Sequence, residues 1–124
     1  RAADRLTEGL PRHGADRFRE CPHEDLATPG RIHLDPYGNV FVCQGISIGN
    51  AWERPLAQIM AEYEPESHPV VGPLLRGGPA ALVAELGLDQ APTGVDHCEV
   101  CFRARRELLA RLPLQLAPAQ VYGR

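Results

Sequence analysis

Apolar and polar residues alternate over a short stretch about a quarter of the way along the chain. This alternation covers residues 31–35, and residues 40–44 are rich in β-branched and aromatic side chains, as strands are. Pro36 and Gly38, between the two stretches, suit a tight turn. The pattern therefore predicts a β-hairpin, with Cys43 near the end of its second strand.

Helical spacing of apolar residues follows the predicted hairpin in three places. We predict helices over residues 55–63, 79–86 and 98–112, each ended by proline or glycine. Residues 45–50 are predicted to be a glycine-bounded connection, and residues 66–78 a loop with at most one helical turn. The expected fold class is therefore α+β, a small hairpin with helices and irregular loops.

Composition and charge limit the possible classes of protein. The chain has 124 residues, which is one domain's worth, and its 44% hydrophobic and 23% charged content is that of a globular, soluble protein. Its net charge of -3 argues against a nucleic-acid-binding role, and no apolar run reaches the length of a membrane span. We expect neither a nucleic-acid partner nor a membrane, and a cytoplasmic location.

Four cysteines carry most of the chemical information in the sequence. Cys21, Cys43, Cys98 and Cys101 follow the spacing C-x21-C-x54-C-x2-C, and the last two open a predicted helix. Four thiolates can hold a tetrahedral zinc ion or a 4Fe-4S cluster, whereas disulfides are the third alternative. A zinc site could also use neighbouring histidines, His23 and His97. A protein-interaction module stabilised by zinc is therefore the alternative function.

The helix predicted to start at the C-x2-C pair offers a favourable environment for thiolates. Free N–H groups at a helix N-terminus provide positive potential there. Arg103, Arg105 and Arg106 add positive charge nearby, although a solvated helix face explains these three residues equally well.

The order of these motifs resembles a known family. Gly38-x4-Cys43, the run Ser47-Ile48-Gly49-Asn50, an amphipathic helix and the distant Cys98-x2-Cys101 together resemble the auxiliary cluster domains of radical S-adenosylmethionine enzymes, called SPASM or, in a shortened one-cluster form, twitch domains. Such domains use a hairpin and a helix to hold 4Fe-4S clusters. The resemblance implies a fold organised around one cluster, with Cys21, Cys43, Cys98 and Cys101 as its complete ligand set.

The resemblance also implies a division of the chain and a role for it. Residues 1–20 would end a helical linker from a missing upstream domain, residues 21–112 would form the cluster domain, and residues 113–124 would be a tail lying over the surface. The C-x3-C-x2-C motif that binds the radical-generating cluster is absent, so S-adenosylmethionine would bind only in an upstream barrel, the expected partner. The implied function is electron transfer or structural support in such an enzyme, with the substrate unassigned.

Overall fold

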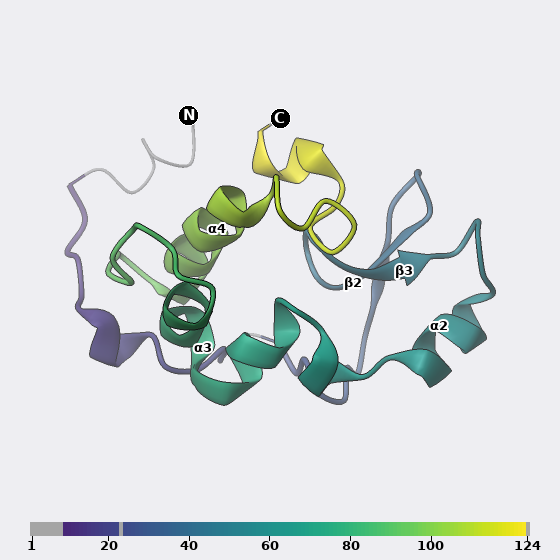
Figure 1. Cartoon of the computed structure of the whole chain (residues 1–124), viewed down its shortest axis with the longest axis horizontal. Helices are drawn as coiled ribbons and strands as arrows, with labels where there is room; N and C mark the ends of the chain where they lie inside the picture. The colour runs from purple at the N-terminus through teal and green to yellow at the C-terminus, as the bar shows by residue number, and fades with distance from the viewer. Residues whose placement is uncertain (1–8, 23, 124) are drawn as a thin grey trace.

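The structure is a computed structural model that describes residues 9–22 and 24–123. Its described part is a small α+β fold with three α-helices and a three-stranded antiparallel sheet of order β1-β2-β3 (Figure 1). This confirms the predicted fold class, while its organisation around a cluster stays a prediction. The elements, in chain order, are the 3-10 helix η1 (Ala15–Arg17), β1 (His33–Leu34), β2 (Asn39–Cys43), β3 (Ile46–Asn50), α2 (Leu56–Glu62), the 3-10 helix η2 (Pro65–Ser67), α3 (Val71–Glu85), α4 (His97–Leu108) and the 3-10 helix η3 (Ala119–Tyr122).

The predicted hairpin is present as β1 and β2, with His33 paired to Phe41. Its turn is held by the Asp35 carboxylate, which accepts two backbone N–H groups of the turn at 2.9 Å each. Gly38 has φ 88°, and a Cβ atom there would lie 2.5 Å from Oδ1 of Asn50. The glycine in this turn is therefore required both by the left-handed backbone and by the close approach of the next strand.

The connection predicted over residues 45–50 is wrong, because Ile46–Asn50 forms the strand β3. A tight turn reverses the chain after β2, and Gly45 adopts φ 84° in it. Ile46 then faces the core, and Ser47 N donates to Gln115 O at 2.8 Å. The strand thus pairs with β2 and also forms a hydrogen bond with the C-terminal segment.

The loop predicted over residues 66–78 is also largely wrong, since α3 begins at Val71. This helix consists of two halves joined across a kink at Gly77 and Gly78, which have non-helical backbone angles. Gly78 has φ 64°, and a Cβ atom there would lie 2.3 Å from the backbone nitrogen of Glu20. The kink therefore lets the N-terminal segment pass directly against the helix.

The helices predicted over residues 55–63 and 98–112 are confirmed as α2 and α4, the latter ending earlier, at Leu108. Helices α3 and α4 pack together in one half of the molecule, and the sheet and α2 lie in the other (Figure 1). One core joins the two halves. Its members are Leu26, Val42, Ile46, Val70, Val71, Leu74, Leu82, Val83, Cys101, Ala104, Leu108, Leu116 and Tyr122.

The C-terminal segment is part of this core and does not simply lie over the surface as predicted. Leu116 is 1% exposed and Tyr122 is 0% exposed. In Figure 1 the segment runs between α4 and the sheet. Burial of these two side chains gives the segment a structural role, because apolar area removed from water stabilises the fold.

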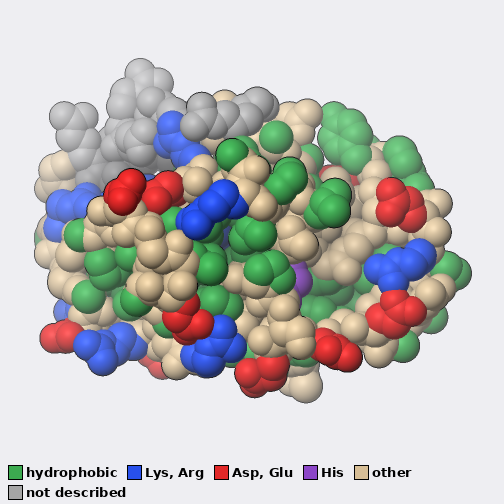
Figure 2. Space-filling model, in the orientation of Figure 1, with side chains coloured by type: hydrophobic (Ala, Val, Ile, Leu, Met, Phe, Trp, Pro, Cys, Tyr) green, Lys and Arg blue, Asp and Glu red, His purple; other side chains and the backbone are tan. Residues whose placement is uncertain are grey.

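Two other expectations concern the N-terminus and the surface. Of the helical linker expected over residues 1–20, residues 1–8 lie outside the described part of the chain, and the only helix within residues 9–20 is the short 3-10 helix Ala15–Arg17. No helix among the described residues is long and apolar enough to cross a membrane. Acidic and basic side chains are interspersed over the face shown in Figure 2.

Candidate metal centre

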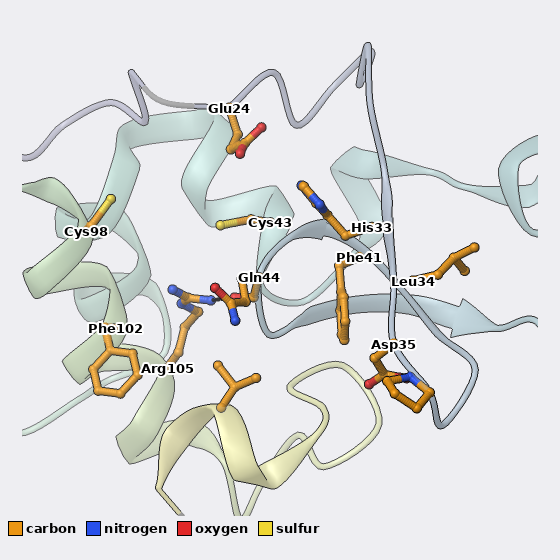
Figure 3. Close-up of a pocket in the computed structure, with 12 residues that line it drawn as sticks. Glu24, His33, Leu34, Asp35, Phe41, Cys43, Gln44, Cys98, Phe102 and Arg105 are labelled. Atoms are coloured by element: carbon orange, nitrogen blue, oxygen red, sulfur yellow. Dashed lines mark hydrogen bonds between the residues drawn. The ribbon is translucent and has the colours of Figure 1, made fainter. Parts of the chain in front are cut away.

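The four cysteines come from three separate segments of the chain, and Cys43, Cys98 and Cys101 each lie close enough to two of the other three to be affected by their charge. All four are free thiols. Cys101 is 8% exposed and belongs to the core, whereas Cys21 and Cys43 are half-buried against it. Cys43 and Cys98 line one cavity of about 780 Å³, and Figure 3 shows them with Arg105 among its lining residues.

Cys21 lies outside any helix or strand, as predicted, and nearby contacts fix its segment. Phe18 is buried three residues earlier, and its carbonyl oxygen accepts the backbone N–H of Ala80 at 2.9 Å. The Phe18 ring meets the ring of His97 edge-on, with 5.2 Å between centroids and an interplanar angle of 82°. These contacts hold the loop of Cys21 against α3 and against the start of α4.

Cys43 ends β2, and the turn that follows it is attached to α4 and to the C-terminal segment. Nη1 of Arg105 donates to the Gln44 carbonyl oxygen at 2.7 Å. Oη of Tyr122 donates to the Gly45 carbonyl oxygen at 2.6 Å. The position of Cys43 relative to α4 is therefore set by two side chains that are distant in sequence.

Cys98 and Cys101 lie in the first turns of α4, whose start is capped. The Asp96 carboxylate accepts the N–H of Glu99 at 2.8 Å, and the Glu99 carboxylate accepts the N–H of Val95 at 3.2 Å. This arrangement satisfies backbone donors that the helix leaves unpaired at its N-terminus. The cap fixes the helix start, and with it the directions in which both cysteine side chains leave the backbone.

The electrostatics show that the four thiols influence one another. Burial is the largest cause of the raised pKa of Cys43, Cys98 and Cys101. A thiolate charge at Cys21 further raises the pKa of each of these three, whereas the charge of Arg105 lowers it. The thiols of Cys43, Cys98 and Cys101 are therefore held protonated, and binding a metal through these sulfur atoms must release protons.

Arg105 is the charged residue at the centre of this group. Burial alone would lower the pKa of Arg105, but the negative charges that Cys101, Tyr122 and Cys43 carry when ionised outweigh it and raise this pKa. Nη1 of Arg105 also lies 3.1 Å from Oη of Tyr122. Nε of Arg105 is buried and has no hydrogen-bond partner among the described residues. A buried cation with one unused donor thus lies beside the thiols.

The sequence pointed to three arginines of α4 as equals and did not distinguish Arg105. Its spacing could have distinguished Arg105, because Cys98, Cys101 and Arg105 are spaced i, i+3 and i+7 and so share one helix face. Arg103 lies elsewhere, in an ion pair with Glu99.

The zinc alternative would use the histidines next to the thiols in the sequence, His23 and His97. His23 lies outside the described residues, and the ring of His97 packs on Phe18. Within residues 9–22 and 24–123, no three or more His, Cys, Asp or Glu side chains form a group ready to hold a metal ion. Among these residues, the four thiols therefore do not form a preformed site for a metal ion.

No family of known proteins, no curated protein sequence and no solved structure matches the chain.

Proposed function

We propose that this chain is an auxiliary domain that binds one 4Fe-4S cluster through Cys21, Cys43, Cys98 and Cys101. The observation that carries the proposal is that the thiols at the end of β2 and at the start of α4 are all affected by the charges of Cys21 and of buried Arg105. Cysteine thiolates are the usual ligands of such clusters, and four of them satisfy one cluster.

The chemistry of the surrounding residues fits this ligand set. A cluster with four thiolate ligands carries net negative charge, and Arg105 supplies a buried positive charge beside it. The unpartnered Nε of Arg105 offers an N–H donor that sulfur can accept. When bound, a 4Fe-4S cluster supplies one-electron transfer.

The number of ligands limits what the domain does. Four cysteines leave no iron corner open for a substrate, so we assign the domain a role in electron transfer or structural support. The chain lacks the three-cysteine motif of a radical-generating cluster. We accordingly propose that S-adenosylmethionine binds in an upstream barrel of the parent enzyme, in the cytoplasm, where thiols stay reduced.

The proposal is tested by anaerobic reconstitution of the 124-residue chain with iron and sulfide. Each of the four single Cys→Ala variants should hold less iron and show a weaker brown absorption than the wild type. Thr28→Ser, a conservative change in the loop after Cys21, is the matched control and should bind iron normally. A colourless wild-type protein that instead holds one zinc ion would establish the zinc module.

A further inference from the structure

The guanidinium of Arg105 is fixed by its surroundings. Its side chain is 6% exposed, and Nη1 donates to Gln44 O at 2.7 Å and lies 3.1 Å from Oη of Tyr122. Its Cζ also lies 5.6 Å from the centroid of the Tyr122 ring, within the range of a cation–π contact. A backbone carbonyl, a hydroxyl and an aromatic ring together hold this guanidinium in place, so its charge stays on the cysteine face of α4.

The contacts of the guanidinium leave one of its N–H donors unused. Nε of Arg105 is buried without a partner among the described residues. Leaving a buried donor unpaired costs about 1–3 kcal/mol, and more when the group is charged. Such a donor is tolerated where an acceptor joins it on binding. Cys98, Cys101 and Arg105 are spaced i, i+3 and i+7 on one face of α4, so cysteine sulfur is an acceptor on the same helix face as this donor.

We infer that Arg105 is a positioning residue that sets the reduction potential of the bound cluster. Its N–H donates to a cysteine or cluster sulfur, and its fixed charge stabilises the reduced state, which carries one more negative charge than the oxidised state. Hydrogen bonds to sulfur and burial are established determinants of such potentials. The inference depends on the proposed function, because it requires a cluster at the four cysteines.

The test is a spectroelectrochemical titration of the reconstituted chain, in which dithionite supplies one electron per cluster and ferricyanide removes it. Arg105→Gln should shift the reduction equilibrium at least tenfold toward the oxidised cluster, which is about 59 mV for one electron. Arg105→Lys keeps the charge but loses Nε, and should shift in the same direction by less. Arg106→Gln is the matched control, because Arg106 lines a separate cavity on α4 with Gln90 and Glu107.

The inference is wrong if both Arg105 variants have the potential of Arg106→Gln. Should the Arg105 variants fail to hold a cluster, pulsed EPR of the reduced wild-type protein labelled with ¹⁵N-arginine decides the matter. A ¹⁵N coupling to the cluster that persists in Arg106→Gln supports the inference, and the absence of any coupling overturns it. A wild-type chain that binds no iron refutes the proposed function instead, so the two failures are distinguishable.

Discussion

Oη of Tyr122 donates a hydrogen bond of 2.6 Å to the carbonyl oxygen of Gly45, although the two residues lie 77 positions apart in the chain. This bond attaches the C-terminal 3-10 helix to the turn that follows Cys43. The hydroxyl is buried, and burial raises the pKa of Tyr122 to about 12. The C-terminal segment therefore holds in place the turn that follows Cys43, one of the proposed ligands.

Removing this hydroxyl should weaken the fold. In Tyr122→Phe the Gly45 carbonyl loses its donor, and a buried group left unpaired costs about 1–3 kcal/mol. Urea denaturation should show a loss of stability in that range. The control is Tyr37→Phe, at a side chain that is 54% exposed, where a change within about 0.5 kcal/mol is expected. Equal losses of stability for the two substitutions would contradict the stabilising role of the Tyr122 hydroxyl.

The turn glycine should be equally intolerant of a side chain. Gly45 has φ 84°, and a Cβ atom there would lie 2.5 Å from Oη of Tyr122. Gly45→Ala should cost at least about 1–2 kcal/mol from the left-handed backbone alone. Gly30→Ala is the matched control, since a Cβ atom there meets nothing within 4 Å. Denaturation midpoints of the two variants decide the point, and a midpoint for Gly45→Ala no lower than that for Gly30→Ala would refute it.

His68 should make stability depend on pH. Its Nδ1 accepts the backbone N–H groups of Val70 and Val71 at 3.1 Å each, and its Nε2 lies 2.9 Å from the carbonyl oxygen of Ser47. The neutral ring with hydrogen on Nε2 satisfies all three contacts, whereas a protonated Nδ1 cannot accept. Burial lowers the pKa of His68, and the smaller effect of the Ser47 carbonyl opposes this.

The sign of the pH effect follows from this lowered pKa. The unfolded chain takes up the proton near pH 6.5, and the folded chain takes it up only at lower pH. The stabilisation is therefore complete above about pH 6.5 and is lost as the pH falls toward the folded pKa. Urea midpoints measured from pH 8 to pH 5 should show a decline that is reduced in His68→Gln. Identical pH profiles for the two proteins would rule this out.

Cluster removal should loosen the chain. The proposed ligands lie in the N-terminal loop, at the end of β2 and at the start of α4, so one bound group would link segments that are distant in sequence. The reconstituted protein should melt several degrees above the apo protein, as followed by circular dichroism. Reconstituted Cys101→Ala should lose most of this increase over its own apo form. An apo wild-type chain with the same cooperative melt would show that the hydrophobic core suffices.

The hairpin was predictable because its signals are local. Pro36 and Gly38 set the turn, and alternating or β-branched residues set the strands on either side. The strand β3 was missed because its glycines and polar residues read as a connection. What makes it a strand is pairing with β2 and burial of Ile46, and neither contact is local.

The first half of α3 was missed for a related reason. Gly72, Pro73 and the Gly77–Gly78 pair are helix breakers in a local reading. Burial of Val71 and Leu74 in the core overrides these propensities, and the glycine pair appears as a kink within one helix. Tertiary packing, which the sequence pattern does not reveal, decides this region.

The four cysteines could be selected from the sequence because few residue types form such sites, and their spacing is informative. Arg105 could not be separated from its neighbours in the same way. Its burial depends on Gln44 and Tyr122, which approach from segments far away in the sequence. The proposed ligands can thus be chosen from residue type and spacing. Arg105, proposed to set the reduction potential of the cluster, can be recognised from the tertiary structure.

The central claim is that one 4Fe-4S cluster binds to the four cysteines, and Mössbauer spectroscopy of the ⁵⁷Fe-reconstituted chain tests it most directly. We expect about four iron and four sulfide per chain, with every iron in a tetrahedral, all-sulfur environment. The spectrum should lack a distinct site of the kind that an open corner produces. A protein that binds less than one cluster per chain, or one iron with a non-sulfur ligand, would contradict the account.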